Sequence, residues 1–375
     1  MNFELSEEQQ LLRDAVARFV DDNYNLDSRQ KSARASGGFS KEHWSTMAEL
    51  GWFALPFDEA DGGFGGTQID NMVVMEQIGR GLVLEPFFAS VVLGGGVLKR
   101  GANSAQKAEL VPGLIDGTRQ LTLAYAEEQA RFDLHDVTTT ARSEGGGYVL
   151  NGQKSMVANA ETATQLIVSA RTGGGQIDKT GISLFVVDAA ADGVKLTNFP
   201  TVDGLRASEI SFDNVQVSGD ALICTGGEGF DVLRGVANDA IVALGAEAVG
   251  AMETLYKDTV AYTQEREQFD HPLSDFQVLQ HRMVEMFMEY EQCKSLLLRA
   301  TMELAGGDSA EAQRAVHALK HMVGKAGTFI RENAVQLHGG MGMTEELRVG
   351  HYFKRLIVID AQFGNADFHL EQFAA

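Results

Sequence analysis

The sequence contains little cysteine, little proline and no long apolar run. Only Cys224 and Cys293 occur among 375 residues, too few and too far apart for a disulfide scaffold or a thiolate metal site. A reducing cytoplasm is therefore the expected location. Five prolines and an apolar fraction of 44% predict a globular chain. No run of about 18 apolar residues is available for a membrane span, and the acidic amino terminus differs from the basic start of a signal peptide.

Basic residues are scarce relative to acidic ones. Lys and Arg number 31 against 52 Asp and Glu, so the formal net charge is -21. A net charge of this sign repels phosphate backbones and anionic lipid, which argues against nucleic acid and membrane surfaces as partners. An anionic cofactor would need positive contacts that are local. The length of 375 residues predicts two or three domains.

Residues 1–118 have the pattern of a helical domain. Ser6 and Gln9 form a capping-box pattern, and apolar residues from Leu12 to Val20 then recur at helical spacing. The four glycines of residues 55–68 predict a loop. Helical segments are expected again at residues 69–82 and 104–117.

Residues 119–228 change to a period of two, which is typical of strands. At least six short β-rich runs are separated by clusters of Gly, Asp and Asn, and Asn151-Gly152 predicts a hairpin turn. So many short strands in one segment indicate a small antiparallel β-barrel or a sandwich.

Residues 229–375 return to the helical period. Three long helices are expected around residues 241–259, 279–290 and 316–330. Short connections between long helices favour an antiparallel four-helix bundle. The predicted fold class is therefore α+β, mainly α, with a helical domain, a β domain and a helical bundle in that order.

Common catalytic and metal motifs are missing. His317 and His321 are four residues apart but lack a third ligand nearby, so we interpret them as helix-surface residues and expect no metal site. No Gly-x-Ser-x-Gly elbow precedes a helix, and the glycine clusters do not join a strand to a helix as a dinucleotide-binding fold requires.

Two segments of the predicted bundle have a composition suited to a ligand. In residues 262–280, Arg266 offers a fork of donors for a pyrophosphate and Phe269 offers a stacking face. In "QLHGGMGM" (336–343), Gly339 and Gly340 interrupt a good helix and would let a rigid ligand approach the backbone. An ordinary helix hairpin and a glycine C-cap explain each segment equally well when taken singly.

Taken together, these segments resemble the acyl-CoA dehydrogenase family over the whole chain. Within the family, "VLEPFFASVVLGGGVL", "ARFDLHDV" and "VGHYFKRLIVID" resemble the small subunits of pimeloyl-CoA dehydrogenases and related two-subunit enzymes. The family likeness itself is carried by the motifs "LSEEQQLLRDAVARF", "ELGWFALPFDEADGGFGG", "LNGQK", "YTQEREQFDHPLSDFQ" and "QLHGGMGMTEE".

The resemblance implies an FAD enzyme that introduces a trans-2,3 double bond into an acyl-CoA thioester. It also implies a tetramer whose flavins lie between protomers, and an electron-transfer flavoprotein as acceptor. In the family, the residues that match two segments of this chain reach the adenosine half of a neighbour's FAD. The matching positions are Arg266, Gln268, Phe269, Phe276, Gln277, Gln336, Leu337, His338, Gly339 and Gly340.

The chain departs from the family pattern at the catalytic base. Many members carry a glutamate where this sequence has Phe363, and phenylalanine cannot accept a proton. Others carry it where this chain has Ala240, next to Asp239. Because a helix turns about 100° per residue, Asp239 would point away, and we interpret it as a solvated or capping acid. Glu247 is still less well placed.

The flavin-facing positions depart as well. Glu127 and Asp133 match the family, but Ala126 replaces a threonine and Arg131-Phe132 replaces a Gly-Ser pair. Met156-Val157-Ala158 replaces the Trp-Ile-Thr that follows "NGQK" in the family. The hydroxyl and glycine groups that would hold the flavin ring are therefore missing.

These losses favour a heteromeric enzyme in which a homologous large subunit supplies the base and the flavin pocket. One alternative is a self-sufficient homo-oligomer that uses a non-standard base, with Asp239 as the first suspect. Another is a scaffold subunit that binds no cofactor. The substrate is expected to be a dicarboxylic or bulky acyl-CoA such as pimeloyl-CoA, with steroid side-chain thioesters as a further option.

Overall fold

The structure, a computed structural model, describes residues 5–375, which form eleven α-helices, ten strands and several short helical turns. Two compact units make up the chain. The first collects the residues up to Lys31 with Thr67–Val83 and Ile241–Ala375, and the second collects Ser32–Gly66 and Leu84–Ala240. The predicted domain limits, 1–118, 119–228 and 229–375, remain a prediction.

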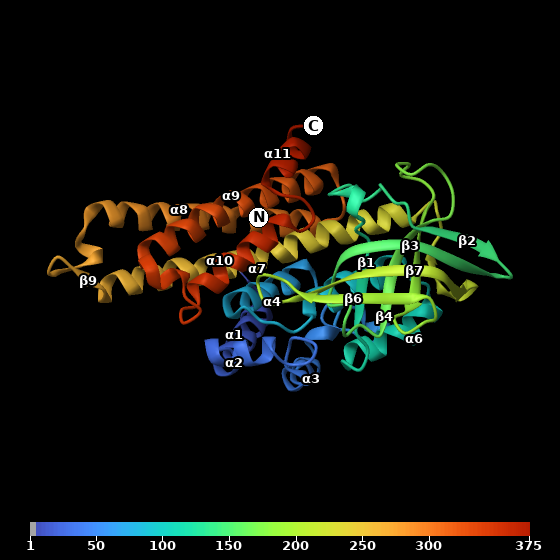
Figure 1. Ribbon diagram of the computed structural model, residues 1–375, viewed down its shortest axis with the longest axis horizontal. Coiled ribbons are helices and arrows are strands. Elements are labelled where there is room, and N and C mark those ends of the chain that lie inside the picture. Colours follow the sequence, from blue (N-terminus) through green and yellow to red (C-terminus); the bar gives the residue numbers. More distant parts are fainter. Residues whose placement is uncertain (1–4) are drawn as a thin grey trace. The chain divides into compact units, whose positions relative to one another are not determined.

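The first unit is helical. Its core is α9 (Ala310–His338), which packs against α8 (Gln277–Ala305), α10 (Val349–Ala361) and α11 (Ala366–Ala374), as Figure 1 shows. The long helix α7 (Gly229–Glu265) joins this bundle from Ile241 onward, so the predicted helical bundle is confirmed. Within residues 5–375, no helix is both long and apolar enough to cross a membrane.

Two further helices of this unit begin with capping boxes. In α1 (Glu7–Asn23), the Ser6 hydroxyl accepts from the N–H of Gln9 while the Gln9 amide accepts from the N–H of Ser6, which confirms the predicted start. Helix α4 (Gln68–Gly81) starts in the same way at Thr67 and packs on α1.

Glycines allow α4 to cross α7 at very short range. A Cβ atom added to Gly79 would lie 1.9 Å from the carbonyl oxygen of Glu247, and one added to Gly250 would lie 1.9 Å from that of Glu76. Any larger side chain at either position would push the helices apart.

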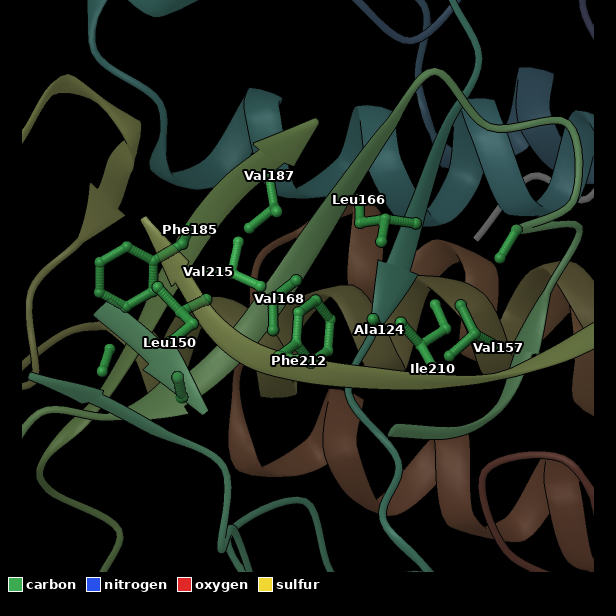
Figure 2. Close-up of a cluster of buried hydrophobic side chains, with 13 residues drawn as sticks. Ala124, Leu150, Val157, Leu166, Val168, Phe185, Val187, Ile210, Phe212 and Val215 are labelled. Carbon is green, nitrogen blue, oxygen red and sulfur yellow. The ribbon is translucent and has the colours of Figure 1, made fainter. Parts of the chain in front are cut away.

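The second unit is built on one sheet with the order β6-β7-β3-β2-β4-β5-β8, and β1 pairs in parallel with β4. Thirteen buried apolar side chains on its strands and adjoining turns form the core seen in Figure 2, among them Leu150, Val168, Phe185 and Phe212. The remaining pairings are antiparallel, apart from one short parallel contact between β2 and β4. The strands are β1 (Leu121–Ala124), β2 (Thr140–Glu144), β3 (Gly147–Ala158), β4 (Gln165–Arg171), β5 (Ile182–Asp188), β6 (Val194–Pro200), β7 (Arg206–Ser218) and β8 (Leu222–Cys224).

Several helices of the second unit precede the sheet in sequence. The π-helical η3 (Phe88–Gly94) packs on β1, and Ser90 Oγ accepts a hydrogen bond from the N–H of Leu121 at 3.0 Å. The other α-helices of this part are α3 (Lys41–Glu49), α5 (Gly95–Gly101) and α6 (Ser104–Ile115). Helix α2 (Leu26–Ala33) begins in the first unit.

The predicted hairpin at Asn151-Gly152 is wrong. Strand β3 runs straight through these residues, and its register against β7 shifts by a bulge between Leu150 and Gly152. A Cβ atom at Gly152 would lie 2.6 Å from Thr139, so the glycine serves a close backbone approach. The turn of this part of the sheet lies between β2 and β3, where Glu144 pairs with Gly147.

Candidate functional site

The two ligand segments predicted from the sequence meet at one end of the helical bundle. Helix α7 ends at Glu265, the hairpin of β9 (Glu267–Gln268) and β10 (His271–Pro272) follows, and α8 begins at Gln277. The ring of Tyr262, in the last turn of α7, stacks on His338 with centroids 4.2 Å apart. The Tyr262 hydroxyl also donates to the His338 carbonyl oxygen at 3.4 Å. The end of α7 is therefore attached to the end of α9.

The side chains of this end are largely exposed. Phe269 is 86% exposed at the tip of the hairpin and makes an edge contact with Phe276 at 6.3 Å. Arg266, Gln277 and Gln336 are exposed, and within residues 5–375 none of the three forms a side-chain hydrogen bond or ion pair. An exposed guanidinium and two exposed amides can bind an anionic or polar ligand from outside the chain.

The remaining predicted residues differ in their accessibility. Leu337 and His338 are buried, and His338 Nδ1 lies 2.8 Å from the Ala334 carbonyl oxygen, so these two side chains point into the bundle. The Gln268 side-chain amide donates to the neighbouring Glu267 carbonyl oxygen and stays exposed. Of the ten predicted residues, Leu337 and His338 are thus the two with buried side chains.

Gly339 and Gly340 form an open backbone surface. Gly339 is the C-cap of α9, with φ 60° and ψ -142°, a conformation that favours glycine strongly. A Cβ atom built on either glycine meets nothing within 4 Å. The end of α9 therefore leaves bare backbone open to a ligand from outside the chain.

The predicted base position holds no ionisable group. Phe363 is 9% exposed and lies in the turn between α10 and α11 with φ 57°, which is unusual for an aromatic residue. Gly364 follows with φ 108°. This part of the turn presents a buried ring where many members of the resembled family have a carboxylate.

Buried side chains hold this turn in place. The Lys320 ammonium, fully buried, donates to the carbonyl oxygens of Asp360 at 2.8 Å and Gly364 at 2.6 Å. His369 Nε2 bonds to the Phe363 carbonyl oxygen at 2.9 Å. Burial lowers the pKa of Lys320 to about 8 and that of His369 to about 3, so the imidazole is neutral at pH 7.

His317 and His321 are not simple surface residues as the sequence suggested. His317 Nδ1 lies 2.9 Å from His369 Nδ1, and His321 Nδ1 lies 3.0 Å from the carbonyl oxygen of Ala366. Both are half-buried and attach α9 to α11. Within residues 5–375, no cluster of three His, Cys, Asp or Glu residues could hold a metal ion.

Asp239 is neither a solvated nor a capping acid. It lies inside α7, and its two carboxylate oxygens accept from Arg100 Nε at 2.8 Å and Arg100 Nη2 at 2.9 Å. A bidentate ion pair with a guanidinium stabilises the carboxylate anion. Ala240, at the alternative base position, is completely buried.

Glu247 is occupied in the same way. The Arg355 guanidinium donates to its two oxygens at 2.6 and 2.7 Å, and both side chains are buried. Removing one partner of such a pair would leave an uncompensated buried charge, so Glu247 has a structural role.

The loop between β1 and β2 matches the segment that faces the flavin in the resembled family. Glu127 joins the two ends of this loop. Its carboxylate accepts from the N–H groups of Thr138 and Thr139 at 2.8 and 3.1 Å and pairs with the Lys154 ammonium at 2.7 Å. Burial alone would raise the pKa of Glu127, but Lys154 and the hydrogen bonds outweigh it and hold the pKa at about 2. Burial lowers the pKa of Lys154 to about 8.

Arg171 fixes the far side of the same loop. Its guanidinium donates to the carbonyl oxygens of His135 at 2.7 Å and Val137 at 3.2 Å. It also donates to three carbonyl oxygens of the β4–β5 loop, those of Gln176, Asp178 and Thr180. Neither Arg171 nor Lys154 was selected from the sequence, because a single basic residue in a strand resembles a solvent-facing one.

The positions predicted to face the flavin ring lack the hydroxyl groups of the family pattern. The loop and the segment after "NGQK" lie together, since the N–H of Ser155 donates to the Ala126 carbonyl oxygen at 2.9 Å. Arg131 occupies the glycine position with φ 51°, and Met156, 57% exposed, has φ 53°. The backbone thus adopts glycine-like conformations while Ala126, Met156 and Ala158 offer no hydroxyl group.

Family models match three consecutive parts of the chain. Residues 6–118 match the N-terminal domain, 122–215 the middle domain and 227–375 the C-terminal domain of acyl-CoA dehydrogenases. The chain belongs to the acyl-CoA dehydrogenase family. The predicted fold class and the predicted oxidoreductase family are confirmed, whereas closeness to the pimeloyl-CoA dehydrogenase small subunits remains a prediction.

Individual members of the acyl-CoA dehydrogenase family agree with this assignment. The probable acyl-CoA dehydrogenase YngJ from Bacillus subtilis is 30% identical and covers 93% of this chain and 92% of its own. The solved glutaryl-coenzyme A dehydrogenase glutaryl-CoA complex is 26% identical, has a TM-score of 0.91 and covers 100% of this chain and 96% of its own. The ChsE4-ChsE5 complex from Mycobacterium tuberculosis is 24% identical, has a TM-score of 0.91 and shows the same fold. The match covers 100% of this chain and 98% of the other.

Proposed function

We propose that this chain is the small subunit of a heteromeric, FAD-dependent acyl-CoA dehydrogenase. A homologous large subunit supplies the catalytic base and the flavin pocket, and this chain completes the adenosine end of the partner's cofactor site. The reaction is the trans-2,3 desaturation of an acyl-CoA thioester. The observation that carries the proposal is the contrast between an open adenosine-facing end and a base position filled by Phe363.

Loss of the base supports this division of labour. A positioned general base typically contributes about 100-fold to 10,000-fold to a rate. Phe363 cannot accept a proton, and Asp239 and Glu247 are each bound bidentately by an arginine. A homo-oligomer of this chain would therefore be a poor dehydrogenase.

The exposed end of the bundle supports a partner subunit. Arg266, Phe269 and the two glycines face solvent. An arginine suits a pyrophosphate, an aromatic ring suits stacking on a nucleobase, and glycines let a ligand approach the backbone closely. The shared fold is compatible with two different chains in one assembly, as in the ChsE4-ChsE5 complex. A scaffold that binds no cofactor would have no use for these residues together.

Substrate and acceptor follow from the family. We propose a dicarboxylic or bulky acyl-CoA as the substrate. A relative of this chain binds glutaryl-CoA, whose acyl group ends in a free carboxylate. An electron-transfer flavoprotein is the proposed acceptor. The buried free thiols of Cys224 and Cys293 suit the proposed cytoplasmic location.

Purification of the chain from its native source tests the proposal. We expect a second, glutamate-bearing family member to co-purify with bound FAD, and the separated chain to be colourless. In the reassembled complex, Arg266→Ala should lower the ratio of FAD to protein severalfold, because it removes a charge-assisted contact to the cofactor. Visible absorbance measures that ratio.

Arg299→Ala, which removes an exposed arginine from the carboxyl-terminal half of α8, is the matched control and should leave the ratio unchanged. Recovery of a yellow, active enzyme made of this chain alone would contradict the proposal. So would full retention of FAD in the Arg266→Ala complex.

A further inference from the structure

Glu85 is a buried carboxyl group that no part of the proposed function uses. Its side chain has no exposed area, although the residue lies in the turn that leads into η3. The segment from Leu82 to Gly95 carries no other acidic or basic residue. A carboxylate in such a place is costly unless both of its oxygens are bonded.

The two oxygens of Glu85 have different surroundings. Oε1 accepts a hydrogen bond from the N–H of Ser40 at 3.2 Å and lies 3.6 Å from His43 Nδ1. Oε2 is buried and has no hydrogen-bond partner among the described residues 5–375. The ionised form would therefore bury an unsatisfied anionic oxygen, whereas the protonated form would bury a neutral group.

The groups that face Glu85 compensate its charge only in part. Burial raises the pKa of Glu85 to about 7, and the N–H groups of Glu85 itself, Ser40 and Leu84 oppose that rise. Burial also lowers the pKa of His43, so its imidazole is neutral at pH 7. The other charged residues of the facing loop and of α3 are exposed to solvent: Arg34, Lys41, Glu42 and Glu49.

Ser40 connects this carboxyl group to the start of a helix. It is the N-cap of α3, and its hydroxyl accepts from the N–H of His43 at 3.2 Å. Gly38, two residues before Ser40, has φ 79° and packs closely on Arg206. A Cβ atom added to Gly38 would lie 2.8 Å from Arg206 Cγ. The carbonyl oxygen of Arg206 in turn accepts from the N–H of Asn159, next to the flavin-facing Ala158.

We propose that Glu85 is a proton-controlled latch, which holds the start of α3 in place as a neutral carboxyl group and releases it on ionisation. Below neutral pH the latch is closed. As the pH rises, the ionised carboxylate is stabilised by reaching water, and the loop of residues 34–40 opens together with the first turn of α3. The device belongs to the fold and does not depend on the proposed heteromer.

Amide hydrogen exchange of the full chain tests the latch. We compare the peptide Ser32–Met47 at pH 6 and pH 8, corrected for the intrinsic change in exchange rate. A carboxyl group with a pKa of about 7 in the closed form and 4.5 in the open form predicts roughly a tenfold larger opening equilibrium at pH 8. Glu85→Gln, which is neutral at both pH values, should remove this difference.

Glu42→Gln, on the exposed face of the same helix, is the control and should retain the tenfold difference. Equal corrected exchange of the wild-type peptide at pH 6 and pH 8 would overturn the latch, and this result needs no variant that might fail to fold. The same difference in Glu85→Gln as in the wild type would also overturn it.

Discussion

Gly339 and Gly340 are adjacent residues with different backbone requirements. Gly339 has a conformation that is nearly restricted to glycine, whereas Gly340 has no positive φ and open space around it. Strain and close approach to a ligand can therefore be separated by two single substitutions.

We expect Gly339→Ala to lower the free energy of unfolding by about 1–3 kcal/mol, because alanine is strained at that φ and ψ. Gly340→Ala should change it by less than about 0.5 kcal/mol. Both should lower the FAD content of the reassembled complex, since each adds a methyl group where the cofactor approaches. Urea unfolding and flavin absorbance give the two quantities. A Gly340→Ala complex with a full complement of FAD would contradict the proposed contact.

Single residues were predictable from the sequence only where a motif names them. Phe363 was identified by position, because the family supplies the expected carboxylate there. The partner of Asp239 was not, since Arg100 is 139 residues away and nothing in either local sequence links them. Glu85 was also missed, because a glutamate before a proline reads as an exposed turn.

The stability of the turn between α10 and α11 depends on pH through His369. Burial lowers the pKa of His369 to about 3, below its ordinary value of 6.5. Between these values the unfolded chain binds more protons than the folded one at this residue, so stability rises with pH over that window.

We expect the unfolding free energy of the wild type to fall from pH 6.5 towards pH 4, with His369 contributing up to about 1.4 kcal/mol per pH unit. His369→Gln keeps a donor for the Phe363 carbonyl oxygen but does not titrate, so its curve should be flatter. Chemical unfolding at several pH values measures both curves. Parallel curves for the two proteins would show that His369 does not contribute.

Elements were predicted well where a cap or a period marks them. Ser6 and Gln9 predict the start of α1, and the periodic apolar residues predict α7, α8 and α9. Strand β3 shows the limit, because Asn151-Gly152 has the composition of a turn. Its glycine is there to avoid Thr139, a contact between β3 and the residue before β2 that only the folded sheet reveals.

The whole molecule carries a net charge of -21, which opposes the association of identical copies. Salt screens exposed charges over a length of about 10 Å at 0.1 M and about 3 Å at 1 M. We expect the isolated chain to self-associate more strongly as sodium chloride is raised from 0.05 to about 0.5 M. If the large subunit is less acidic than this chain, assembly of the two should depend on salt much less.

Sedimentation velocity of the isolated chain and of the reassembled complex measures this difference. Ammonium acetate at matched ionic strength controls for effects specific to chloride. A stable tetramer of the isolated chain at low salt would argue against the proposed division between two different subunits.

Phe269 leaves 86% of an aromatic surface in water at the tip of the β9–β10 hairpin. On the proposed function this surface is covered only while the large subunit is present. Chains synthesised in excess of the large subunit would aggregate or be degraded. A cell therefore gains from synthesising the two polypeptides in equal numbers.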